Sequence, residues 1–70
     1  MNSAVFKKEM KKQGVTQYYL ARRLKISQPA MCQKINNKRS MSLSQAQRLA
    51  QIMGFSRQKA ADIFFCDIVA

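Results

Sequence analysis

The sequence contains no histidine and no tryptophan, and it has only one proline, two glycines and three acidic residues. Without histidine, the chain lacks the usual zinc partner and the most common general base. The acids, Glu9, Asp62 and Asp67, are scattered, and the two cysteines, Cys32 and Cys66, fit no metal-ligand spacing and have no base to activate them. We therefore expect no metal, no cofactor, no small-molecule ligand and no enzymatic activity.

Long hydrophobic runs are also absent. No segment approaches the roughly 20 apolar residues needed to cross a bilayer, and the basic N-terminal stretch lacks the apolar segment of a secretory signal. We expect a cytoplasmic protein without membrane association. A chain of 70 residues can bury only one small core, so residues 1–70 are predicted to form a single domain. Nearly all of its large apolar residues are needed for that core, namely Phe6, Leu20, Leu24, Ile26, Met31, Ile35, Leu43, Leu49, Ile52, Phe55, Ile63 and Phe64.

The charge of the chain is strongly one-sided. Thirteen lysines and arginines stand against three acids, which gives a formal net charge of +10. A field of this sign attracts polyanions. Solubility alone would be served by charges of mixed sign. The imbalance therefore favours a nucleic acid as the partner over a merely solubilising surface.

Polar caps and glycines divide the chain into five segments with the apolar spacing of helices. The expected helices cover residues 4–13, 17–24, 28–36 and about 43–53, with a fifth after Ser56, and their expected N-caps are Ser3, Thr16, Ser27, Ser42 and Ser56. Ser42 and Gln45 have the spacing of a capping box. Gly14 and Gly54 are placed to end the first and fourth helices in a left-handed conformation. We predict a compact all-α domain of five helices without strands.

The second and third of these helices are separated by residues 25–27 only. In the third, Met31 and Ile35 fall on one face, while Pro29 and Gln33 fall on the opposite face. One face is therefore expected to pack against the core, and the other is free to bind.

From residue 16 to residue 39 the pattern T-Q-x-x-L-A-x-x-L-x-I-S-x-x-x-M-x-x-x-I-N-N-K-R resembles the helix-turn-helix of the Cro/C1-type (XRE-like) regulators, which include small phage repressors and Cro proteins. The resemblance implies a lambda-repressor-like fold with the helix-turn-helix at about residues 16–36. In it, Ala21 allows the two helices to approach and Ile26 fills the turn. Lys25 and Asn37 stand where the family usually has glycine, and both residue types can adopt a left-handed conformation.

The resemblance also implies which residues meet DNA, because the second helix of such a motif presents its N-terminal part to base edges in the major groove. The implied base contacts are Gln28, Pro29, Ala30, Cys32 and Gln33. Glutamine amides can pair with adenine, and apolar groups can meet the thymine methyl, so we expect a half-site that contains A·T pairs. The implied phosphate contacts are Gln17, Lys34, Asn36, Lys38 and Arg39. Arg22 and Arg23 are explained equally well as extending this basic surface or as solvated charges.

The leading hypothesis is a sequence-specific regulator of transcription that binds double-stranded DNA, and specifically a Cro-like repressor that occupies an operator. Phe65, Ile68 and Val69 lie off the inner face of the fifth helix, which suggests a dimer interface or a tail folded over the core. Binding to two half-sites favours a homodimer on DNA. The alternative is a controller or antitoxin-type regulator whose C-terminal tail binds a protein partner. A membrane-surface peptide is disfavoured by the caps and turns along the chain.

Overall fold

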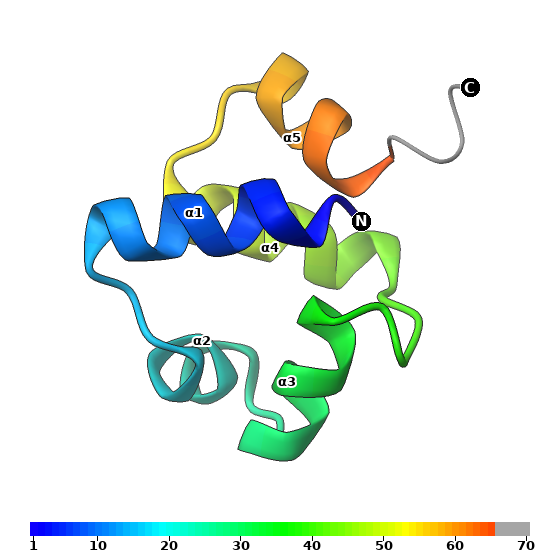
Figure 1. Cartoon of the computed structure of the whole chain (residues 1–70). Coiled ribbons are helices and arrows are strands. Elements are labelled where there is room, and N and C mark those ends of the chain that lie inside the picture. The colour runs from blue at the N-terminus through cyan, green and yellow to red at the C-terminus, as the bar shows by residue number, and fades with distance from the viewer. Residues whose placement is uncertain (66–70) are drawn as a thin grey trace.

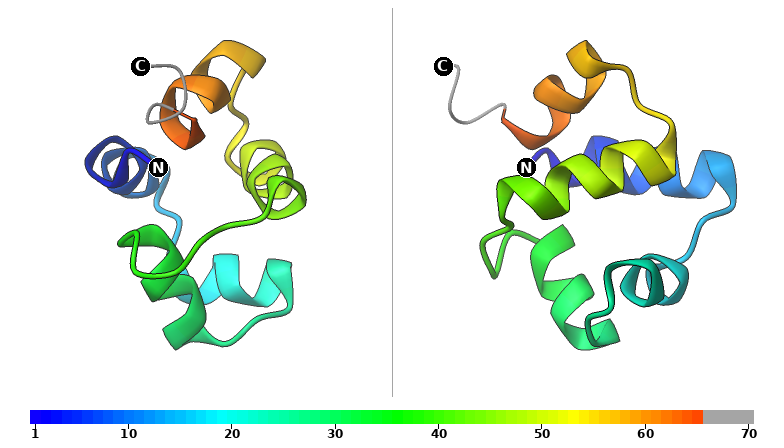
Figure 2. Two further views of the ribbon diagram at one scale, coloured as in Figure 1. Left: turned by 90° about the vertical axis from the view of Figure 1, so that its right-hand side faces the viewer. Right: turned by 180° about the vertical axis from the view of Figure 1, so that it is seen from behind.

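The computed structural model describes residues 1–65, and in this part of the chain it contains five α-helices and no strand. The helices are α1 (Ser3–Gln13), α2 (Gln17–Leu24), α3 (Gln28–Ile35), α4 (Leu43–Met53) and α5 (Arg57–Phe64). α1 and α4 lie side by side across the middle, with α5 on one side of them and the α2–α3 pair on the other (Figures 1 and 2). The predicted five-helix, all-α fold is confirmed.

Local capping explains why the helices begin where they do. The side-chain oxygens of Thr16, Ser27, Ser42 and Ser56 each accept a backbone N–H three residues later, at 3.1–3.2 Å. In α4, the Ser42 N–H also donates to the Gln45 side chain at 3.3 Å, which completes the predicted capping box. Four of the five predicted N-caps are thus confirmed.

The predicted cap of α1 is wrong by one residue. Asn2, not Ser3, is the N-cap, because its Oδ1 accepts the Val5 N–H at 3.3 Å, and Ser3 is already the first helical residue. The backbone N–H of Asn2 also donates to the Ile63 carbonyl at 2.6 Å, which fixes the cap against α5. A second difference concerns α3, which ends at Ile35, one residue earlier than predicted.

Left-handed residues end several of the helices. Gly14 and Gly54 have φ values of 70° and 71°, as their positions predicted. Lys25, which ends α2, has a φ of 58°, and Asn37, which follows α3, has a φ of 61°. Lys25 and Asn37 therefore adopt the left-handed conformation that was expected to be open to both residue types.

The core draws on all five helices. Its largest fully buried side chains are Phe6, Leu20, Met31, Ile35, Leu49 and Ile63. The Phe6 ring packs edge-on against Phe55, with centroids 6.2 Å apart, and against Phe64 at 5.9 Å. Leu43 was predicted to be buried, but it is 58% exposed. It is the first residue of α4 and lies at the edge of that helix's apolar stripe, where fewer neighbours cover it.

One ion pair joins α1 to α5. Lys59 Nζ lies 2.6 Å from Glu9 Oε1, and the Lys59 ammonium also lies over the Phe55 ring, 5.6 Å from its centroid. The hydrogen bond from Lys59 lowers the pKa of the Glu9 carboxyl group. Within residues 1–65, none of the helices combines the length and the apolar character that a transmembrane span requires.

Candidate nucleic-acid interface

α2 and α3 form a rigid unit around a short turn. The N–H of Lys25 donates to the Arg22 carbonyl at 3.2 Å, and that of Ile26 donates to the Ala21 carbonyl at 3.0 Å, which closes the end of α2. Ile26 is half-buried and packs against the core, and Ser27 then caps α3. The turn is therefore held by backbone bonds and by one apolar side chain.

α3 has a buried face and an exposed face, as its spacing predicted. Met31 and Ile35 are completely buried. Among the five predicted base contacts, Gln28, Pro29 and Gln33 are exposed, and the remaining two, Ala30 and Cys32, are half-buried. The first turn of α3 lies at the edge of the molecule farthest from α5 (Figure 1). The structure thus leaves none of these five residues of α3 buried; we call these five residues the reading surface.

The first turns of α2 and α3 carry backbone donors that are free for a ligand. At the start of α2, Thr16 accepts the N–H groups of Tyr19 and Leu20, so those of Gln17 and Tyr18 have no intrahelical partner. In α3, Ser27 accepts the N–H groups of Ala30 and Met31 in the same way. In α3 only Gln28 keeps a free N–H, because Pro29 has none, so α2 offers two free backbone donors and α3 one to an anion.

Two of the predicted phosphate contacts already have structural roles. Lys34 Nζ donates to the Ser40 carbonyl at 2.9 Å and ties α3 to the loop that follows it. The Asn36 amide donates to the Cys32 carbonyl at 2.8 Å and accepts a hydrogen bond from Lys7 Nζ at 2.5 Å. Sequence reasoning missed these contacts because they depend on the path of the loop and of α1. Lys34 still has two ammonium hydrogens for another acceptor, whereas both ends of the Asn36 amide are engaged.

Three further predicted phosphate contacts remain accessible. Lys38 and Arg39 are exposed in the turn after α3, and Gln17 is half-buried at the first position of α2. The neighbouring Asn37 is held by Met1, whose α-amino group donates to Asn37 Oδ1 at 2.7 Å. The Asn37 amide in turn donates to the Met1 carbonyl at 2.9 Å. This two-way contact fixes the turn that carries Lys38 and Arg39.

The outward face of α2 carries two aromatic and basic pairs that sequence reasoning did not identify. The Arg22 guanidinium lies 5.8 Å from the centroid of the Tyr18 ring and donates to its hydroxyl oxygen at 3.4 Å. Arg23 repeats this arrangement on Tyr19, at 5.8 Å from the centroid and 3.0 Å from the hydroxyl oxygen. The i, i+4 spacing of each tyrosine and arginine was the signal in the sequence. We call these residues the Tyr–Arg pairs.

Of the predicted dimer contacts, only Phe65 belongs to the described part of the chain. It is half-buried and borders a groove between α4 and α5 that Leu43, Phe55 and Phe64 also line. Ile68 and Val69 lie outside the described residues. Among residues 1–65, no three histidine, cysteine or acidic side chains come close enough together to hold a metal ion.

Comparisons with protein-family models, curated proteins and solved structures find no match to this chain. The function of the interface is therefore inferred from its own residues.

Proposed function

We propose that this protein is a sequence-specific regulator of transcription, a Cro-like repressor that places α3 in the major groove of an operator. The observation that carries the proposal is the division of α3. Met31 and Ile35 fix one side of the helix in the core with no exposed surface, while Gln28, Pro29 and Gln33 stand exposed on the other side. A helix held in this way can enter a groove without losing its packing.

The side chains on the reading surface suit base edges. Each glutamine amide offers one donor and one acceptor, which match N6 and N7 of adenine. Pro29 is exposed beside them and offers an apolar surface that fits a thymine methyl group. Neither glutamine side chain makes a hydrogen bond within residues 1–65, so both amides are available. The proposed half-site therefore contains A·T pairs.

Positive groups surround this surface and would set its position on the duplex. The free N–H groups at the start of α2, together with Lys38 and Arg39, are donors of the kind that bind phosphate oxygens. A net charge of +10 strengthens this attraction without selecting a sequence. Blocking polymerase then requires only that the bound protein occupy the operator.

A homodimer on DNA completes the proposal. Helix-turn-helix proteins commonly bind two half-sites one helical turn apart, about 34 to 36 Å, and this arrangement needs two copies related by a two-fold axis. Phe65 follows the last residue of α5 and borders two hollows, the groove between α4 and α5 and a second one that Lys34, Lys38 and Arg39 also line. Contacts between copies through the groove between α4 and α5 would leave both copies of α3 uncovered.

Selection from a randomised duplex library tests the proposal. The wild-type protein should enrich a pseudo-palindrome with A·T pairs and with half-sites one turn apart. Gln28→Ala and Gln33→Ala should each weaken the preference at one position by about 1–3 kcal/mol, roughly 5- to 150-fold. Gln58→Ala, an exposed glutamine of α5, is the matched control and should leave the preference unchanged. Salt-sensitive retention without enrichment would indicate non-specific coating of DNA, and no retention would refute DNA binding altogether.

A further inference from the structure

The outward face of α2 consists of the two Tyr–Arg pairs alone. Leu20, Ala21 and Leu24 form the opposite, buried face of this helix. Tyr18 and Tyr19 are 55% and 44% exposed, which is unusual for aromatic side chains in a chain with so small a core. A shallow hollow lined by both pairs opens between them. The core therefore gives no reason for two adjacent tyrosines at this place.

We propose that the Tyr–Arg pairs bind phosphodiester groups of the DNA that flanks the half-site read by α3. The inference rests on the proposed DNA-binding function and extends the footprint beyond the reading surface. It assigns phosphate binding to Arg22 and Arg23 and a positioning role to Tyr18 and Tyr19.

Each pair presents a set of donors that suits a phosphate. The tyrosine hydroxyl oxygen accepts a hydrogen bond from the guanidinium, so its own O–H hydrogen remains available to an outside acceptor. The guanidinium has four further N–H groups and lies against a ring that restricts its motion. Holding the arginine in place before binding reduces the entropy that the contact would otherwise cost.

No carboxylate competes for these arginines within residues 1–65. The ion pair found there joins Glu9 to Lys59, on α1 and α5. The backbone that carries the pairs is also held in place, because Arg48 of α4 donates to the Arg23 carbonyl at 3.3 Å in the last turn of α2. Both guanidinium charges are therefore uncompensated and are carried by a fixed helix.

The position of the pairs favours DNA over an acidic protein as the occupant. Tyr18 supplies one of the free N–H groups at the start of α2, so the same residue carries a backbone donor and one of the Tyr–Arg pairs. A protein interface of ordinary size would need some 20–30 residues on this side. A track of phosphates needs only single donors at intervals, which is what the outward face of α2 offers.

The salt dependence of binding to a selected operator duplex tests the inference. The slope of log Kobs against log salt falls by about 0.9 for every phosphate contact that is lost. The double variant Arg22→Ala/Arg23→Ala should therefore reduce the slope by about 1.8. Arg57→Ala, an exposed arginine at the start of α5, is the charge-matched control and should leave the slope unchanged. Far-UV circular dichroism verifies that every variant is folded.

A second measurement separates flanking contacts from the reading surface. Wild-type affinity should rise when a minimal duplex is lengthened by base pairs outside the half-sites, and the double variant should lose that gain. Tyr18→Phe and Tyr19→Phe keep the ring under each arginine but remove the hydroxyl group, so each should weaken the gain less than the arginine changes do. If the double variant reduces the slope by only about 0.9, one of the two Tyr–Arg pairs contacts a phosphate. The single variants Arg22→Ala and Arg23→Ala then identify which pair it is.

An unchanged slope together with an unchanged gain from flanking DNA would overturn the inference while leaving the proposed function intact. That result would favour an acidic protein as the partner of the Tyr–Arg pairs. Failure of the wild-type protein to bind any duplex would instead refute the proposed function itself. The two failures are thus distinguishable in the same titrations.

Discussion

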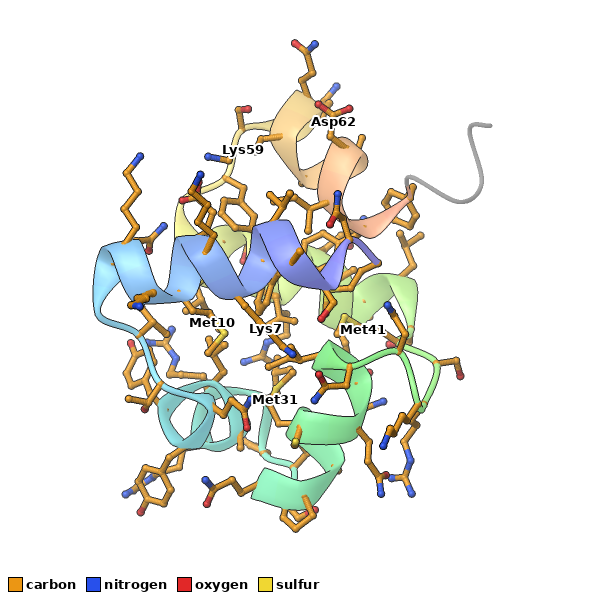
Figure 3. All side chains as sticks on the ribbon, in the orientation of Figure 1. Lys7, Met10, Met31, Met41, Lys59 and Asp62 are labelled. Atoms are coloured by element: carbon orange, nitrogen blue, oxygen red, sulfur yellow. The ribbon has the colours of Figure 1, made fainter. Side chains whose placement is uncertain are left out.

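Removing the Met31 side chain should lower the stability of this protein without changing any residue of the reading surface. It is completely buried and belongs to the same core cluster as Met10 (Figure 3). It also carries much of the attachment of α3, because the only other buried residue of that helix is Ile35. Met31→Ala removes the atoms that fill this space and leaves a cavity in the core.

The expected cost is large relative to the stability of so small a chain. Replacing a buried methionine by alanine destabilises a protein by about 2–5 kcal/mol. At about 0.05–0.15 kcal/mol per residue, a chain of 70 residues has a free energy of unfolding of about 4–10 kcal/mol. Met31→Ala should therefore remove at least a fifth of the free energy of unfolding, and at the upper end of the range it should unfold the protein.

Urea denaturation followed by far-UV circular dichroism measures this loss as a lower midpoint with an unchanged slope. Gln33→Ala lies two residues along the same helix but is exposed, and it should change stability by less than about 0.5 kcal/mol. Met31→Leu, which nearly conserves volume, should cost less than about 1.5 kcal/mol. A loss below about 1 kcal/mol for Met31→Ala would refute the conclusion that this side chain anchors α3.

Further predictions concern the backbone conformation at Lys25 and Gly14 and the ion pair between Glu9 and Lys59. The left-handed conformation of Lys25 costs most residues roughly 1–2 kcal/mol, and the greater freedom of unfolded glycine offsets only part of that. Lys25→Gly should therefore raise the free energy of unfolding by about 0.5–1 kcal/mol and, with it, the midpoint of urea denaturation. Gly14→Ala, where no atom would contact the added methyl group, should lower it through backbone strain alone; opposite signs would contradict this reasoning. Glu9→Gln should destabilise the protein at pH 7, because the Lys59 hydrogen bond lowers the folded-state pKa of Glu9. The difference in stability between this variant and the wild type should vanish as the pH falls below the ordinary pKa of 4.5 and through the lowered one. Asp62→Asn, at an exposed acid, is the control in the same pH series, and an Asp62→Asn profile equal to that of Glu9→Gln would show that the ion pair contributes nothing.

The sequence predicts the helices of this fold well because their limits depend on neighbouring residues. A serine or threonine accepts an N–H only three residues away, and Gly14 ends α1 through its own backbone conformation. The error at α1 arises because Asn2 is also a good cap and gains a contact to Ile63 on a distant helix. Leu43 fits the apolar period of α4, yet periodicity does not show whether other helices cover the first turn of α4, where Leu43 is exposed.

The candidate site was predictable only in part. The resemblance placed the reading surface on α3, and the structure brings those residues together. Lys34 was expected to contact phosphate, and in the structure its ammonium donates to the Ser40 carbonyl, a contact that depends on how the loop after α3 folds back. The Tyr–Arg pairs required knowing that Tyr18 and Tyr19 have no place in the core, which depends on how α2 packs.

In the proposed function, specificity and stability are separable, because buried and exposed residues alternate along α3. Gln28 and Gln33 form no contact that holds the fold together, so their replacement could redirect base preference without the cost that a core substitution brings. Lys34 lies between the two roles, because its ammonium fixes the loop while retaining donors for phosphate. A loss of affinity at Lys34 would therefore not by itself establish a phosphate contact, whereas a loss at Lys38 or Arg39, whose side chains are exposed, would.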